Sequence, residues 1–220
     1  MISLIVHHNP DVRDSFVRAL SLERKVEEAG KTLYQHGKWL YIALDTPITP
    51  EVYASLLEDY NPDALYLPTF GQSIDMVHEE GDIILPNVFL SYNPLIEITN
   101  VDESNRDTFL GQADFLESYN EQKDYYVEDY GLSIGGIAVG WLPENYDETQ
   151  NDKLMMAYEA DVYLTDSIRE LIEIVKTEAA PSYITCGIIR GKKSANPMNS
   201  VLDTTVRNMI TTWRLMEDEE

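Results

Sequence analysis

The 220-residue sequence predicts an α/β protein with three layers, in which a central, mostly parallel mixed sheet is flanked by helices. Short apolar, β-branched runs alternate along the chain with amphipathic helical segments, and a helix-start signal follows each of the first two strands. Strands that alternate with helices are typical of parallel sheets covered on both faces. Because no repeat or linker divides the chain and 44% of its residues are hydrophobic, we expect one domain over residues 1–220.

The first ninety residues predict strands and two well-marked helices. Asn9-Pro10-Asp11 offers a helix cap, a proline suited to the first helical position and an acid in the first turn, and Thr49-Pro50-Glu51 repeats this signal. Pro68 and the turn signal Gly81-Asp82 interrupt the later strands. The expected elements are a strand at 2–6, a helix from 10 to about 29, a strand at 38–44, a helix from 50, and strands at 64–67 and 82–90.

An acidic excursion separates these elements from the second half of the chain. Residues 97–130 hold ten acids, two bases and four tyrosines without a clear period, which indicates a surface excursion or a small cap over a site. Further on, Ser167 and Glu170 form a capping box that opens a helix. Strands are expected at 132–139, 161–165 and 182–190, followed by a final helix with Leu202, Val206, Ile210 and Trp213 on one side.

The composition excludes several classes of partner. Thirty-nine acids against sixteen bases give a formal net charge of −23, and so negative a surface repels nucleic-acid phosphates and anionic membranes. The start of the chain lacks the basic stretch of a signal peptide, and no run approaches the roughly 18 apolar residues of a membrane span. We therefore expect a cytoplasmic protein that binds neither nucleic acid nor membrane.

Metal and nucleophile chemistry find little support in the sequence. The phosphate-loop, dinucleotide-binding and His-Glu-x-x-His motifs are absent. His7 and His8 end the first strand, and because neighbours on a strand point to opposite faces, we expect no metal site there. The single cysteine, Cys186, cannot form an intramolecular disulfide and lies in an apolar strand, which predicts a packed, inert thiol.

A basic segment follows the strand at 182–190. Arg190, Lys192 and Lys193 stand within residues 179–207, which hold four bases and one acid in a strongly negative chain. At the carboxyl end of a strand they would form an anion pocket for phosphate or a nucleotide. The alternative is that they pair with the abundant surface acids, which stabilises a protein little.

The segment from Pro62 to Leu85 resembles the purine nucleoside phosphorylase and nucleosidase superfamily. That family has Pro-Asp before a strand, then Thr-Gly-Ser-Ala-Gly, then Val-Gly-Asp-Ile-Val-Val, and Pro62-Asp63 and Gly81-Asp82 keep the family's spacing. Other segments follow in the family's order, at 2–29, 132–141, 162–167 and 184–194. The resemblance implies the family's fold, a homo-oligomer, a nucleoside or nucleotide ligand, and cleavage of the N-glycosidic bond by water or by phosphate as co-substrate, with no other cofactor.

The resemblance also assigns site positions. Its catalytic positions are Asp11, near the family's acid that activates water, Ser194, where the family has the aspartate that protonates the base, and Asp166, one residue from the ribose-binding glutamate. Its ligand-binding positions are Thr69, Gly71, Trp141, Ser167 and Arg190. A serine hydroxyl is far too weak an acid for the role at 194, and Phe70 stands where a glycine would allow close approach of the backbone to a ligand. The catalytic positions are therefore altered.

Three of these positions have a structural alternative. Asp11 suits the positive end of a helix dipole, and Ser167 suits a helix cap. Trp141 is an aromatic face for a base or an ordinary core residue. Function at these positions therefore depends on what surrounds them in the fold.

Three hypotheses follow. The first is a retained nucleoside-cleaving scaffold that binds a nucleoside or nucleotide, with Asp11 or Asp166 as the acid or base if cleavage occurs. The second is a catalytically inactive protein whose acidic surface binds a basic protein partner. The third, an unrelated doubly wound enzyme, predicts a sheet order unlike that of the phosphorylase family.

Overall fold

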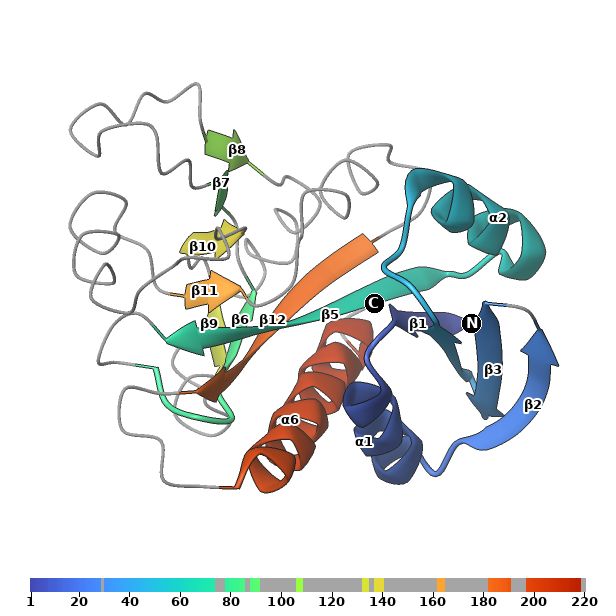
Figure 1. The fold of residues 1–220 in the computed structure, drawn as a ribbon, viewed down its shortest axis with the longest axis horizontal. Helices are drawn as coiled ribbons and strands as arrows, with labels where there is room; N and C mark the ends of the chain where they lie inside the picture. The colour runs from blue at the N-terminus through green and yellow to red at the C-terminus, as the bar shows by residue number, and fades with distance from the viewer. Residues whose placement is uncertain are drawn as a thin grey trace.

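The fold is an α/β sheet with helices on both faces (Figure 1). The computed structural model describes residues 1–28, 30–73, 78–85, 88–91, 106–108, 132–134, 137–140, 162–164, 182–190 and 197–218. The elements are β1 (Ser3–His7), α1 (Pro10–Leu20), β2 (Glu23–Glu28), β3 (Lys31–His36), β4 (Trp39–Leu44), α2 (Pro50–Tyr60), β5 (Ala64–Ser73), β6 (Ile83–Leu85), β7 (Val88–Ser91), β8 (Arg106–Thr108), β9 (Leu132–Ile134), β10 (Ile137–Gly140), β11 (Val162–Leu164), β12 (Ser182–Arg190) and α6 (Met198–Asp218).

The sheet is mixed, with a parallel centre. Its main path runs β2-β3-β4-β1-β5-β11-β10-β7-β8, and β12 pairs with the other side of β5 and leads to β6 and β9. β1 pairs in parallel with β4 and β5, and β12 pairs in parallel with β5 over most of its length. The pairs β2–β3, β3–β4, β5–β11, β6–β12 and β7–β8 are antiparallel. The predicted mixed α/β architecture is confirmed.

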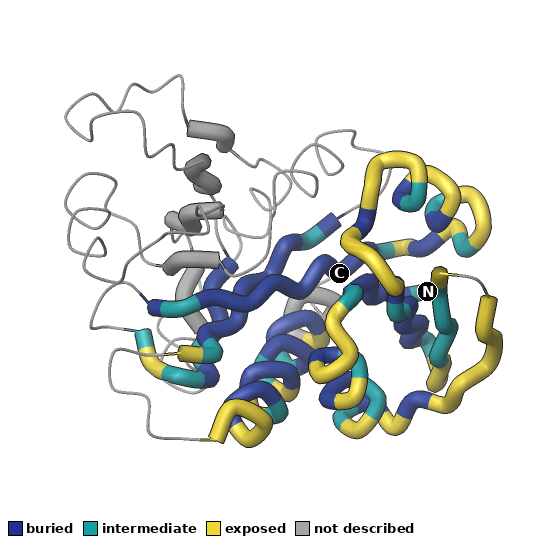
Figure 2. The backbone as a smooth tube through the Cα atoms, viewed as in Figure 1, coloured by how far each residue is buried: buried dark blue, intermediate teal, exposed yellow. Residues whose placement is uncertain are grey.

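Alternating residues of the central strands enter two separate cores. Leu4 and Val6 face one core, which α2 covers with Tyr53 and Leu56, while Ile5 faces the other. The second core is closed by α1 and α6, which lie side by side on the opposite face of the sheet from α2 (Figure 1). Figure 2 shows buried backbone along the central strands and exposed residues on the outer sides of the helices.

Both helix-start signals work as predicted. The Asn9 side chain accepts a hydrogen bond from the backbone N–H of Asp11 at 2.9 Å, and Thr49 caps α2 in the same way through Val52. Each helix ends at a residue with positive φ, Ser21 at 53° and Asn61 at 40°. Each of the two helices is 11 residues long and is capped at both ends.

The helix predicted over 10–29 is too long. α1 ends at Leu20, and the residues from Glu23 to Glu28 form β2, an exposed strand that pairs with β3. The sequence of β2, Glu-Arg-Lys-Val-Glu-Glu, contains mostly good helix formers, but pairing with β3 overrides that local preference. β3 and its hairpin to β4, which turns at Gly37 with a φ of 58°, were not expected.

The later strands also differ from the predicted bounds. β5 continues through Pro68 to Ser73 instead of ending at Leu67. Along one edge, β5 pairs with β1 as far as Tyr66 and with β11 from Gly71. Pro68 lies in the stretch between these two pairings, so on that edge its missing N–H removes no hydrogen bond to a neighbouring strand. The strand predicted over 82–90 contains two described strands, β6 and β7, and that over 132–139 contains β9 and β10.

Several predicted elements are confirmed. The strands at 38–44, 161–165 and 182–190 correspond to β4, β11 and β12, and the final helix is α6. The helix expected from Ser167, and the acidic excursion at 97–130 except for β8, lie outside the described residues. No helix within the described ranges is both long and apolar enough to span a membrane.

Helix α6 is held closely against β12. The Trp213 indole N–H donates to the Thr185 hydroxyl at 2.8 Å, and the Trp213 ring stacks on Tyr66 with centroids 4.6 Å apart. Gly187 lies under the same helix, where a Cβ atom would come within 2.1 Å of the Thr205 side chain. The contact between β12 and α6 therefore depends on a residue without a side chain at 187.

Candidate functional site

The chain path has a topological switch point at the carboxyl end of β1. From β1 the chain passes through α1 and the β2–β3 hairpin to β4, on one side of β1. It then crosses through α2, on the opposite face, to β5 on the other side of β1. Open α/β sheets bind ligands where successive connections leave in opposite directions, outside the carboxyl ends of the strands. The first place to look for a site is therefore the end of β1.

A buried imidazole occupies this position. His7, the last residue of β1, is 6% exposed, and its ring meets the edge of Phe70 with centroids 5.7 Å apart. Its Nδ1 accepts a hydrogen bond from the backbone N–H of Asn9 at 3.0 Å. In a neutral imidazole, an Nδ1 that accepts a hydrogen bond leaves the ring proton on Nε2, which can then donate.

His8 lies beside His7 instead of on the opposite face. The two imidazole rings stack with centroids 5.0 Å apart and planes inclined by 18°. The expectation that they point to opposite faces is wrong, because β1 ends at His7 and strand alternation does not extend to His8. Among the described residues, no three His, Cys, Asp or Glu side chains are grouped as metal ligands.

The imidazole pair is the site feature that our sequence reasoning did not assign. The sequence alone pointed to no role for His7 and His8 other than metal binding, which it disfavoured. The position of His7, at the carboxyl end of the first strand, could have indicated a ligand site, because open α/β sheets bind ligands there. His7 is the one histidine among the described residues whose side chain the fold buries.

Thr69 and Gly71 lie inside the sheet. Both are buried in β5, where Thr69 pairs with Cys186 of β12 and Gly71 pairs with Ile188. The Thr69 hydroxyl donates to the backbone carbonyl of Thr185 at 3.4 Å. Thr69 and Gly71, which the resemblance assigns to ligand binding, therefore lie in an extended strand.

The Phe70 side chain packs in the core and does not project toward a ligand. Its side chain is 3% exposed and packs with the residues under α1 and α6. The ring contact with His7 makes Phe70 one wall of the His7 environment. Cys186, in the neighbouring strand, is fully buried in the core on the α2 side, as predicted for a packed thiol.

Asp11 and Arg190 are exposed at the ends of their elements. Asp11 stands in the first turn of α1, two residues after the cap Asn9 and directly beyond β1. Arg190 ends β12 opposite Gln72, after an irregularity in the pairing that begins at Ile188. The other four predicted site positions lie outside the described residues: Trp141, Asp166, Ser167 and Ser194.

Solved nucleosidase structures share this architecture over the whole chain. The 5′-methylthioadenosine/S-adenosylhomocysteine nucleosidase of Campylobacter jejuni aligns with a TM-score of 0.68 at 13% identity, covering 100% of both chains. The futalosine hydrolase of Helicobacter pylori gives 0.68 at 10% identity over 100% of this chain and 98% of its own. The 5′-methylthioadenosine nucleosidase of Arabidopsis thaliana gives 0.62 at 12% identity over 96% and 93%.

This chain has the nucleosidase fold. The resemblance inferred from the sequence is confirmed at the level of the fold, and an unrelated doubly wound architecture is excluded. No family model matches the sequence, and no curated protein matches it significantly. At these identities the shared property is the chain path, and the reaction has to be inferred from the residues around the end of β1.

Proposed function

We propose that this protein binds a nucleoside at the carboxyl end of β1, beside β5, and hydrolyses its N-glycosidic bond. The observation that carries the proposal is the switch in chain direction at β1, within a fold shared from end to end with nucleosidases. One such neighbour, from Helicobacter pylori, holds 5′-methylthioadenosine in its active site. The base and the sugar of a nucleoside offer apolar faces and hydrogen-bond acceptors, which suit the imidazole of His7 at the end of β1.

The reaction requires two proton transfers. Water attacks the anomeric carbon, the bond from that carbon to the base nitrogen breaks, and the base leaves with a proton. Asp11, directly beyond β1, is our candidate for the carboxylate that takes the proton from water. Asp166 is our candidate for the second carboxyl, because the serine at 194 cannot supply a proton to the base.

A nucleoside panel tests the proposal. The purified chain is incubated with purine and pyrimidine nucleosides and with 5′-methylthioadenosine, with and without phosphate, and free base is measured by chromatography. We expect base release that does not need phosphate, and a raised melting temperature with at least one nucleoside, because a ligand that binds only the folded chain stabilises it.

Two variants and a matched control separate the roles. We expect Asp11→Ala and Asp166→Ala each to lower base release by at least about 100-fold, the usual contribution of a general acid or base. Asp14→Ala, in the same helix but paired with Arg13, should leave the rate unchanged. Release of free base by both variants would refute the assignment of these two residues but would still support an enzymatic function. Absence of both base release and any thermal shift would refute the proposed function.

Three expectations stay predictions. A homo-oligomer and a cytoplasmic location come from the family resemblance and from the composition. The alternative function, an inactive acidic protein that binds a basic partner, rests on the net charge of −23 and on residues 97–130. Salt-sensitive capture of a basic protein by a chain that binds no nucleoside would support that alternative.

A further inference from the structure

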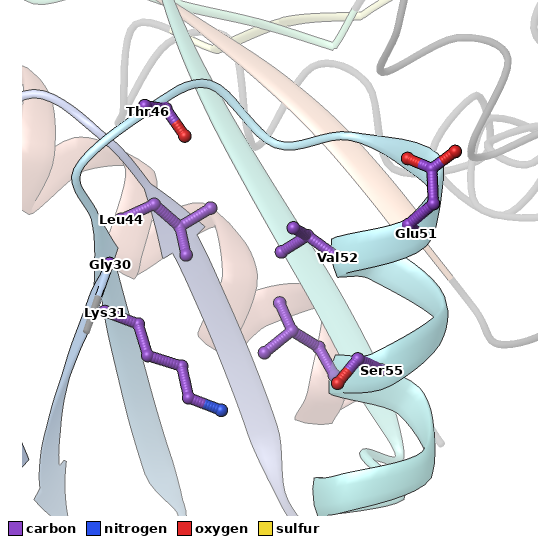
Figure 3. A pocket seen from close by; sticks show the side chains of 8 residues that line it. Gly30, Lys31, Leu44, Thr46, Glu51, Val52 and Ser55 are labelled. Atoms are coloured by element: carbon purple, nitrogen blue, oxygen red, sulfur yellow. The ribbon is translucent and has the colours of Figure 1, made fainter. Parts of the chain in front are cut away.

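A cavity lies under α2 (Figure 3). Phe70 packs on the opposite face of the sheet. The cavity has a volume of about 350 Å³, within the range of small-molecule sites, and opens between the start of β3, the end of β4 and the first turns of α2. The residues that line it are Gly30, Lys31, Leu44, Thr46, Glu51, Val52, Ser55 and Leu56.

The floor of this cavity is aliphatic. Leu44 and Leu56 are buried members of the core under α2, and Val52 packs against the same core. Figure 3 shows Leu44 and Val52 extending toward each other across the cavity. Phe70, by contrast, belongs to the core under α1 and α6. The cavity is therefore separate from the proposed nucleoside site, and an apolar group of a ligand would be stabilised on this floor.

One end of the cavity carries a positive charge. The Lys31 side chain is 26% exposed, and its ammonium lies 3.3 Å from Glu28 and 3.5 Å from Asp59. Both acids pair with this ammonium, and Glu28 accepts a hydrogen bond from it, although neither acid lines the cavity. Burial alone would lower the pKa of Lys31, but Tyr60, Glu28 and Asp59 raise it, so the ammonium stays charged at neutral pH. An ammonium has three donors, which leaves capacity for another acceptor.

The other charged residue of the lining is already engaged. A hydrogen bond from Thr49 and a second from its own backbone N–H lower the pKa of Glu51, so this carboxylate is bound at the start of α2. In Figure 3 the Glu51 carboxylate points away from Lys31. The remaining polar groups of the lining are the hydroxyls of Thr46 and Ser55, and the Ser55 hydroxyl donates to Asp59 at 3.4 Å.

We propose that this cavity binds a small aliphatic monocarboxylate, with the carboxylate on the Lys31 ammonium and the hydrocarbon on Leu44, Val52 and Leu56. Glu28 and Asp59 already share this ammonium, and the chain's charge of −23 also opposes an anion. Salt screens the long-range part of that field beyond about 8 Å, and the third donor of the ammonium contacts the carboxylate directly. The site is independent of the proposed nucleoside chemistry.

Three compounds of one carbon skeleton test the charge preference. 4-Methylpentanoate, 4-methylpentan-1-ol and 4-methylpentan-1-amine are titrated into the full chain, and the methyl resonances of Leu44, Val52 and Leu56 are followed by NMR. We expect all three resonances to shift, with the carboxylate binding about fivefold more tightly than the alcohol, as for a surface ion pair at the strong end of its range, and the amine most weakly. Equal affinity of carboxylate and alcohol, or no shift at these methyls, would overturn the proposal.

Variants locate the preference on one side chain. Lys31→Met keeps the aliphatic stem and should abolish the preference for the carboxylate while the alcohol still binds, which also shows that the cavity is intact. Lys25→Met, at an exposed lysine paired with Glu23, is the matched control and should leave all three affinities unchanged. Ser55→Phe should fill the cavity and remove binding of all three compounds. A carboxylate preference that persists in Lys31→Met, or binding that persists in folded Ser55→Phe, would refute the assignment.

Discussion

Replacing Gly187 by alanine should destabilise the chain by about 3 kcal/mol, the upper end of the cost of overpacking a core. An alanine Cβ at this position would lie 2.1 Å from Thr205 Cγ2 and 2.8 Å from Met209 Cε, against ordinary contact at 3.4 Å or more. Gly187 is paired with Phe70 on one side and with Ile83 on the other, so β12 cannot move away from α6 without breaking these strand pairs. Helix α6 must therefore move by more than 1 Å or lose its packing.

The methyl group of Thr205 is the main obstacle, and it can be removed separately. Thr205→Ser deletes Cγ2 and keeps the hydroxyl, which donates to the Val201 carbonyl at 2.8 Å. Alone it should cost about 1 kcal/mol for the lost buried methyl. With Gly187→Ala it should restore at least about 1 kcal/mol relative to the sum of the two single effects, because the residues touch.

Urea unfolding followed by tryptophan fluorescence measures all three variants, since Trp213 is fully buried at the same contact. Alanine in place of glycine also restricts the unfolded chain, which offsets the clash by about 0.4–1 kcal/mol. A Gly187→Ala chain within 1 kcal/mol of the parent, or a double variant that shows no coupling, would refute the packing that we describe between β12 and α6.

Two further substitutions test polar side chains. The buried Tyr41 hydroxyl has no hydrogen-bond partner among the described residues, and burial raises its pKa. Tyr41→Phe should therefore leave the free energy of unfolding unchanged or raise it by up to about 1 kcal/mol in urea unfolding. A loss of stability above about 1 kcal/mol would reveal a partner. Asp203 accepts hydrogen bonds from Ser15 at 2.7 Å and from Arg18 at 2.6 Å, which join α1 to α6 and lower the pKa of Asp203. Asp203→Asn should therefore lower the free energy of unfolding by about 1–2 kcal/mol at pH 7. A carboxylate whose pKa is lowered by folding stabilises the chain above its unfolded pKa and loses that effect as it protonates. The difference in stability between variant and parent should therefore disappear as the pH falls below about 4. A gap that stays constant down to pH 2.5 would contradict this role of Asp203.

Local signals in the sequence were sufficient for the helix starts but not for the end of α1. The caps Asn9 and Thr49 act through hydrogen bonds within three residues, so they can be recognised without the rest of the fold. The end of α1 was missed because residues 23–28 favour a helix locally and become a strand only by pairing with β3. Gly37, in the two-residue turn between His36 and Trp39, was the signal that marks the second hairpin.

The candidate site was predictable in part. Its place at the end of the first strand follows from the alternation of strands and helices, whereas Asp11 was named because of the family resemblance. The stacking of His8 on His7 could not be predicted, because it depends on where β1 ends. The extended conformation at Thr69 and Gly71 was also missed, since it depends on β12 and β11, which come more than 90 residues later in the chain.

The sequence by itself determined the class of fold, the order of most strands and helices, the two capped helix starts and the resemblance to nucleosidases. These properties reside in side-chain periodicity and in contacts between near neighbours along the chain. Only the tertiary structure decided which strands pair, how far β5 extends, and that Lys31 and Val52, from separate elements, line one cavity. Pairing and cavity formation join residues that are distant in sequence, and the free energy that stabilises them arises only when those segments meet.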